Sequence, residues 1–280
     1  MNYKAIIFYL GLFIFPLSGL SFLNILYSTY FDYFLSIESY TITFFLTLIT
    51  GSFFYFYGKS SLRKISFYEQ LLLIILVYLV SSLFISLPYY LSNYQITFVD
   101  SIFESFSGLT STGFSIFENI KYLDPTLILW RSSSQWIGGL YFLYSIIFLI
   151  DIYDESLKKS LTNFLSFNSS EVLKQAIKIF LLYSGLTIFI FIVLNIIGIR
   201  SFNSLNLAMT IISSGGFLPV NDLSSVLVYN SQIIIFSFLM LISFFSIFFI
   251  YNLVFLKNKN LNFFYEDFHL FLYLLIVLSI

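Results

Sequence analysis

Long apolar runs separated by short polar stretches make up most of this sequence. A helix needs about 20 apolar residues to cross a hydrocarbon core of about 30 Å, and runs of that length recur along the chain. The pattern predicts six membrane-spanning helices, at residues 5–28, 38–57, 68–90, 125–150, 174–198 and 226–255.

Two further segments, 100–110 and 203–213, are too short and too polar to span a membrane. Each lies between two spanning helices and runs directly into a polar loop that contains glycine. Non-helical backbone at membrane depth is tolerated only where it is buried in protein or lines a water-filled path. We therefore interpret both segments as re-entrant pore helices. The predicted fold class is all-α, with polytopic transmembrane helices and two re-entrant pore-helix/filter-loop repeats.

An internal repeat supports this interpretation. The order span, short helix, glycine loop, span occurs at 68–150 and again at 174–255, with LTSTGFS at 109–115 in the first unit and IISSGGFLP at 211–219 in the second. A single serine- and glycine-rich loop is usually a tight turn between helices. Its recurrence at the same place in both units favours a pore.

Glycine admits backbone angles that other residues avoid, so Gly113 and Gly216 would allow consecutive carbonyl oxygens to replace the hydration shell of an ion. Each short helix ends at its loop, and the negative end of the helix dipole there favours a cation. We expect Phe114 and Phe217 to pack outward and brace the loops. The predicted ion-binding residues are Thr110, Ser111, Thr112, Gly113 and Phe114 in the first loop and Ser213, Ser214, Gly215, Gly216 and Phe217 in the second.

Composition agrees with a membrane protein and excludes other classes. The chain is 59% hydrophobic and 10% charged, and its net charge of −1 argues against nucleic-acid binding. With no cysteine and only one histidine, His269, it has neither thiolate nor multi-histidine metal motifs. We interpret His269, beside Glu266 and Asp267, as solvated and inert. The first apolar run lacks a small-residue cleavage site, so we expect a retained span.

The basic residues predict the orientation, because cytoplasmic loops are enriched in lysine and arginine. One face collects Lys4, Lys59, Arg63, Lys64, Lys158, Lys159, Lys174, Lys178, Lys257 and Lys259, whereas Lys121, Arg131 and Arg200 fall on the other. This places a multi-pass protein in the plasma membrane with a cytoplasmic N-terminus. The outer loops also carry Asp100, Glu104, Glu118, Asp124 and Asp222, which form either an acidic vestibule that concentrates cations or ordinary solvated charges.

Three stretches resemble the Trk/Ktr/HKT superfamily of potassium transporters, and specifically its TrkH-like subunits. They are FESFSGLTSTGFS at 103–115, LWRSSSQWIGGL at 129–140 and SSGGF at 213–217. The second of these is similar to the family signature after the first filter, and its matching residues are Trp130, Arg131, Gln135, Trp136, Gly138 and Gly139.

The resemblance implies four pseudo-equivalent repeats around one potassium path, often preceded by two extra helices. Glycine at the filter position goes with potassium preference in this family. The resemblance also implies potassium as the transported ion, no covalent cofactor, an inner-membrane location, a homodimer and a cytoplasmic nucleotide-binding regulatory subunit of the TrkA type. The basic segment 158–178 is a plausible contact for that subunit.

Only two of the four repeats are recognisable in this sequence. We divide the chain into two additional transmembrane helices at 1–66, a first pore repeat at 67–152, a second at 170–256 and the start of an incomplete third at 262–280. Either a C-terminal half is missing or two chains together supply four loops, and we favour truncation. Whether transport would be channel-like or coupled stays open.

Several residues have two interpretations. Arg131 is more often an interfacial anchor than a group that tunes the vestibule, and Gly138 with Gly139 more often permits close helix packing than hinging. A truncated, non-conducting subunit or scaffold is the alternative function. An intramembrane hydrolase is disfavoured because a serine nucleophile needs a nearby base, so we predict that the chain is not an enzyme.

Overall fold

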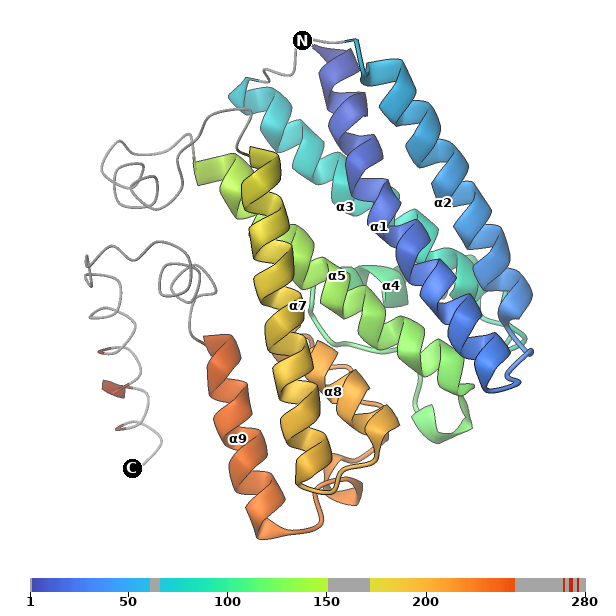
Figure 1. Cartoon of the computed structure of the whole chain (residues 1–280). Helices are drawn as coiled ribbons and strands as arrows, with labels where there is room; N and C mark the ends of the chain where they lie inside the picture. Colours follow the sequence, from blue (N-terminus) through green and yellow to red (C-terminus); the bar gives the residue numbers. More distant parts are fainter. Residues whose placement is uncertain are drawn as a thin grey trace.

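The computed structural model describes residues 2–60, 66–150 and 172–244, with residues 269, 272, 273 and 276 as isolated positions. The described part is helical and contains no strand (Figure 1). Its helices are α1 (Tyr3–Tyr30), α2 (Ile37–Gly58), α3 (Phe67–Tyr90), α4 (Phe98–Leu109), α5 (Pro125–Ile150), α7 (Val172–Ile196), α8 (Ser201–Ser213) and α9 (Asn230–Phe244), with short 3-10 turns η1 (Ile120–Tyr122) and η2 (Leu223–Ser225).

The two N-terminal helices form a closely packed hairpin (Figure 1). A Cβ added to Gly58 would lie 2.5 Å from the backbone oxygen of Lys4, and one added to Gly11 would lie 2.8 Å from the backbone nitrogen of Tyr55. Small residues at such contacts let two helix backbones approach without a hydrophobic driving force, as membrane helices require.

The rest of the described chain consists of two units with the same order of elements. The first runs through α3, α4, η1 and α5, and the second through α7, α8, η2 and α9. In each unit a long helix is followed by a short helix, a loop with a 3-10 turn and another helix. The helix positions predicted from the apolar pattern agree with these bounds. The predicted sixth span is described only over α9, and the segments 151–171 and 262–268 lie outside the described residues.

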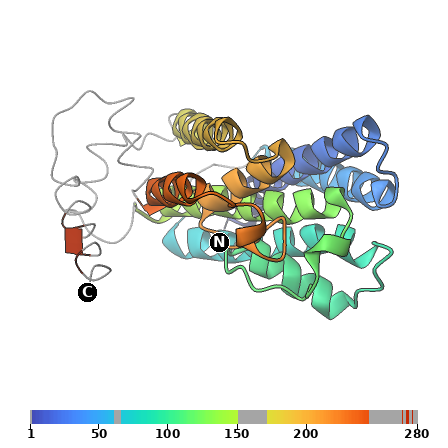
Figure 2. The same cartoon turned by 90° about the horizontal axis from the view of Figure 1, so that it is seen from below.

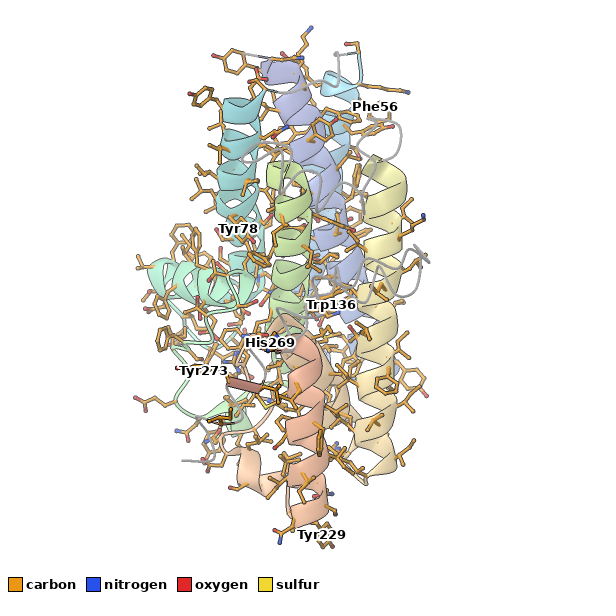
Figure 3. The ribbon with its side chains drawn as sticks, turned by 90° about the vertical axis from the view of Figure 1, so that its left-hand side faces the viewer. Phe56, Tyr78, Trp136, Tyr229, His269 and Tyr273 are labelled. Atoms are coloured by element: carbon orange, nitrogen blue, oxygen red, sulfur yellow. The ribbon has the colours of Figure 1, made fainter. Side chains whose placement is uncertain are left out.

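The long helices run along one common direction. In Figure 3, Phe56 of α2 marks one end of the bundle, Tyr229 before α9 marks the other, and Trp136 of α5 lies between them. Seen along this direction, α1 and α2 lie at one edge of the bundle, while α7 and α9 lie towards the other (Figure 2). Among the described helices, α1, α2, α3 and α7 are long and apolar enough to cross a membrane.

The central helix α5 differs from those four because its middle is polar. Its 26 residues correspond to about 39 Å at 1.5 Å per residue, which is long enough to span. Its polar stretch, Arg131–Gln135, is buried within the protein instead of facing outward. Two apolar cores meet on α5, one formed with α1, α3 and α4 and the other with α7, α8 and α9.

Local sequence signals set the helix ends next to the loops. The Thr97 hydroxyl accepts a hydrogen bond from the backbone N–H of Asp100 at 3.2 Å and caps α4. Helix α5 begins at Pro125, whose missing N–H costs nothing in the first turn, and the backbone oxygen of Asp124 accepts the N–H of Leu127 at 2.9 Å.

Candidate functional site

The two short helices end in the same backbone motif. At the end of α4, the N–H of Ser111 bonds to Gly108 O at 3.0 Å and that of Thr112 to Ser107 O at 2.9 Å. At the end of α8, the corresponding donors are Ser214, to Ile211 O at 3.1 Å, and Gly215, to Thr210 O at 2.9 Å. This pair of bonds is the Schellman motif, whose left-handed position is usually glycine. Here serine occupies it, with φ of 53° at Ser111 and 52° at Ser214.

Two residues further on, the backbone of both loops returns to the left-handed region. Gly113 has φ of +82° and Gly216 has +84°, whereas Thr112 and Gly215 before them are not in that region. Positions of positive and negative φ therefore alternate in the same order in both loops.

The two glycines lie against each other. A Cβ added to Gly216 would lie 3.4 Å from Gly113 Cα, and one added to Gly113 would lie 2.6 Å from the carbonyl oxygen of Gly215. The loops thus converge on one place although 103 positions separate the two glycines in the sequence.

A hydroxyl from each short helix holds the far side of its own loop. Ser107 Oγ donates to the carbonyl oxygen of Phe114 at 2.5 Å, and Thr210 Oγ1 donates to that of Phe217 at 2.7 Å. These donors are pseudo-equivalent, because each precedes its loop glycine by six positions. The sequence interpretation missed both, although a hydroxyl at the same repeat position was a detectable signal.

Glycines in α5 allow both short helices to end in the middle of the bundle. A Cβ on Gly138 would lie 2.0 Å from Leu109 O, and one on Gly139 would lie 3.2 Å from Ser213 Cα. Gly138 is about 20 Å from the start of α5 at 1.5 Å per residue, so α4 and α8 stop about halfway along it. These contacts agree with the packing interpretation of the two glycines rather than with a hinge.

A buried ion pair fixes the segment that follows Gly113 in the first loop. Arg131 Nε lies 2.8 Å from Glu104 Oε1, with exposures of 1% and 0%. The second carboxylate oxygen of Glu104 accepts the N–H of Ile116 at 2.9 Å, and Arg131 Nη2 donates to Ser115 Oγ at 2.8 Å. Two charges in such surroundings are tolerated because they are paired and hydrogen-bonded.

This geometry corrects two predictions. Arg131 is not an interfacial anchor, because its side chain turns into the protein and pairs with Glu104 from α4. Glu104 is neither a vestibule group nor a solvated loop charge, since it is fully buried. A linear sequence does not reveal that a pore-helix carboxylate and an α5 guanidinium face each other.

The two phenylalanines after the loop glycines have different surroundings. Phe217 is buried, and the Arg131 guanidinium lies 4.3 Å from the centre of its ring. Phe114 is 70% exposed, so the prediction that it braces the first loop is wrong for the described structure. The reason is positional: α5 covers Phe217 from the preceding unit, and no described helix covers Phe114 in the same way.

Gln135 holds the second loop from α5. Its Nε2 donates to Gly215 O at 2.5 Å, and its Oε1 accepts the N–H of Phe217 at 3.1 Å. Thr210 Oγ1, whose one hydrogen is shared with Phe217 O, lies 3.2 Å from the same Oε1. The side chain is completely buried. A residue of the first unit therefore fixes the backbone of the second.

The two tryptophans of the signature join α5 to the flanking helices. Trp130 is buried and donates from Nε1 to Ile85 O of α3 at 3.0 Å. Trp136, labelled in Figure 3, donates to Thr187 Oγ1 of α7 at 2.9 Å. Each indole N–H therefore finds an acceptor inside the bundle, as a buried tryptophan requires.

The segments that follow the two glycine loops are also tied together. Asn221 Oδ1 accepts the N–H of Ile120 at 2.8 Å, and its Nδ2 donates to Asn119 Oδ1 at 3.1 Å. Beside them lies a cavity of about 590 Å³, lined in part by Asp100 and Tyr94. Burial raises the pKa of Tyr94, and the hydroxyl accepts the N–H of Asp124 at 2.6 Å.

The other acidic residues predicted for the outer loops divide into two groups. Asp100, Glu118 and Asp222 are exposed, as either a vestibule or a set of solvated charges requires, whereas Asp124 is buried at the start of α5. Within the described residues, no group of three or more histidine, cysteine, aspartate or glutamate side chains is placed to hold a metal ion. The predicted basic contact at 158–178 lies mostly outside those residues, as do Glu266 and Asp267 beside His269.

Taken together, the helices and loops define an all-helical, multi-pass membrane protein built from two helix-and-loop units. Comparison with known proteins identifies its relatives. An uncharacterized cation transporter of Methanocaldococcus jannaschii is 26% identical over 213 residues, which cover 69% of this chain and 43% of that protein. The potassium uptake protein TrkH of Escherichia coli K12 is 31% identical over 104 residues, or 37% of this chain and 22% of TrkH.

The fold matches as well. The crystal structure of the potassium transporter TrkH from Vibrio parahaemolyticus aligns with a TM-score of 0.73 and 22% identity, over 88% of this chain and 50% of that one. The chain thus spans half or less of the length of these relatives, and no family model matches it.

The chain is therefore similar in sequence to TrkH and shares the fold of its crystal structure. These relatives are named as transporters.

Proposed function

We propose that this chain forms part of a potassium path whose walls are the backbone carbonyls of the two glycine loops. The observation that carries the proposal is that two loops with positive φ at matching positions converge on the contact between Gly113 and Gly216. Two unrelated tight turns would have no reason to repeat both the left-handed positions and the hydroxyl-to-carbonyl bonds, and then to meet.

The carbonyls available to an ion can be named. Within the described residues, the backbone oxygens of Thr112, Gly113 and Gly216 accept no hydrogen bond, so each keeps both lone pairs for a cation. The negative ends of the α4 and α8 dipoles lie at the same place and favour positive charge. Carbonyl oxygens arranged in this way can replace the water that an ion loses on entry.

The orientation proposed for the chain places the N-terminus in the cytoplasm. Lys4 and Lys59 lie at one end of the bundle, since Gly58 packs against the backbone of Lys4. Lys121 and Arg200 lie in connections at the opposite end, Lys121 shortly before α5 and Arg200 directly before α8. The loops would then be entered from outside the plasma or inner membrane.

Potassium is the proposed cargo, because glycine at both filter positions goes with potassium preference in the family that the chain resembles. We also propose assembly as a homodimer in the lipid bilayer with a cytoplasmic nucleotide-binding subunit of the TrkA type. The support is the naming of the relatives as parts of a Trk system.

Growth of a potassium-uptake-deficient cell on limiting potassium tests the proposal. We would compare this 280-residue chain with a form extended through any downstream coding sequence, at matched membrane levels. Rescue by either form, accompanied by uptake of rubidium as a potassium tracer, is the expected result. Failure of both forms despite normal membrane insertion would contradict the proposal and favour a non-conducting scaffold.

A further inference from the structure

The hydrogen bonds of Gln135 to the second loop are not explained by the proposed ion path alone. The side chain is completely buried, and its amide donates to Gly215 O, accepts the N–H of Phe217 and lies 3.2 Å from Thr210 Oγ1 of the helix before the loop. We propose that Gln135 is a positioning residue that sets which carbonyls of the second loop face the ion path, by holding the Gly215 carbonyl towards α5. This inference rests on the proposed function.

A comparison of the two loops supports the assignment. By the repeat offset, Gly215 corresponds to Thr112 of the first loop. Gly215 is buried and its carbonyl accepts the Gln135 amide, whereas Thr112 is exposed and its carbonyl accepts no hydrogen bond within the described residues. The loops share a backbone pattern but present different sets of free oxygens.

The doubled glycine of the second loop provides an independent observation. A Cβ added to Gly215 would lie 2.4 Å from both Cδ and Oε1 of Gln135. Gly215 does not have the left-handed backbone that would by itself favour glycine. Its lack of a side chain is therefore explained by the close approach of Gln135, which the first loop, with threonine at this place, does not experience.

The arrangement couples the two units. Gln135 belongs to α5 of the first unit, but it fixes the backbone on both sides of Gly216 in the second. Ion selectivity depends on the number and orientation of coordinating carbonyls. A side chain that withholds one carbonyl therefore contributes to selectivity without touching the ion.

Replacement of Gln135 by methionine tests this assignment, because methionine keeps the length of the side chain and removes its hydrogen bonds. The experiment uses whichever form of the chain transports potassium and measures the ratio of potassium to sodium uptake. We expect this ratio to fall about two- to tenfold in Q135M, the range that corresponds to the loss of one or two neutral hydrogen bonds. A purely structural role would lower total flux and leave the ratio unchanged.

Gln232 supplies a matched control. It is buried, accepts the N–H groups of Val228 and Tyr229 at 2.9 and 3.1 Å, and donates to Ile197 O at 3.0 Å, at the outer end of α9. We expect Q232M to keep the wild-type ratio. If Q135M does not reach the membrane, Q135E replaces it, since a carboxylate still accepts from Phe217 but has no donor for Gly215.

The outcomes separate the two proposals. Absence of potassium uptake by every form of the wild-type chain would overturn the proposed function and this inference with it. Wild-type uptake together with an unchanged ratio in Q135M or Q135E would overturn only the role of Gln135. An equal shift in Q232M would also overturn it, because any buried glutamine would then have the same effect.

Discussion

Gly113 and Gly216 approach so closely that a side chain at Gly113 would displace the second loop, whereas a Cβ at Gly216 would just reach van der Waals contact with Gly113. The nearest atoms to an added Cβ are backbone atoms in both cases, at 2.6 Å for Gly113 and 3.4 Å for Gly216. Backbone cannot rotate away as the end of a flexible side chain can. The contact therefore couples the geometry of the two loops directly.

Alanine at Gly113 should be more harmful than alanine at Gly216. Both positions have positive φ, which costs a residue with a Cβ about 1–2 kcal/mol, and only Gly113 adds a contact below 3.0 Å. We expect G113A to lower the unfolding temperature and the potassium-to-sodium uptake ratio more than G216A does. Thermal unfolding in detergent and tracer uptake measure the two effects.

Gly185 of α7 is the matched control for this comparison, because nothing lies within 4 Å of its added Cβ and its backbone is helical. Alanine there should be neutral or stabilising by up to about 1 kcal/mol. Unchanged ion preference in both G113A and G216A, with G185A also unchanged, would count against the loops as a selectivity filter.

The sequence alone was sufficient to predict where the described helices lie and where the two glycine loops interrupt them. Apolar runs of spanning length and two glycine loops at matching places are properties that a linear pattern records. The left-handed backbone positions were only partly predictable from the sequence. Glycine at 113 and 216 indicated two of them, but nothing in the sequence indicated that Ser111 and Ser214 are also left-handed.

The close packing at Gly138 leads to a second prediction. An added Cβ there would lie 2.0 Å from Leu109 O, whereas at Gly19 of α1 it would meet nothing within 4 Å. G138A should therefore lower the free energy of unfolding by about 1–3 kcal/mol, the cost of overpacking, and G19A should not. Equal stability of the two variants in a denaturant titration would show that α4 does not end against α5.

The ion pair of Glu104 and Arg131 leads to a third prediction. Removing one charge leaves the other buried and unpaired, which costs about 3–5 kcal/mol, whereas replacing both by apolar residues is often nearly neutral. We expect E104M and R131M each to unfold at a much lower temperature than the E104M/R131M double variant. Additive effects of the two single changes would contradict a direct pair.

The roles of Arg131, Glu104 and Gln135 could not be read from the sequence because they depend on which helix faces which loop. Arg131 and Glu104 lie 27 positions apart, and Gln135 acts on a loop 80 positions later. The unequal burial of Phe114 and Phe217 has the same origin, since a repeat in sequence does not give both copies the same neighbours. Contacts between units are tertiary information.

Glycine at Ser111 or Ser214 should stabilise the protein. Both serines occupy the left-handed position of a Schellman motif, where a residue with a Cβ costs about 1 kcal/mol more than glycine. Within the described residues, neither serine hydroxyl makes a hydrogen bond that would offset this cost. We expect S111G and S214G each to raise the unfolding temperature slightly, as thermal unfolding in detergent would measure. Thr112, one position further on, provides the control: T112G should be destabilising, because its backbone is not left-handed and glycine adds only flexibility there. Stabilisation by all three substitutions would indicate a general effect of glycine in this loop and would contradict the assigned backbone handedness.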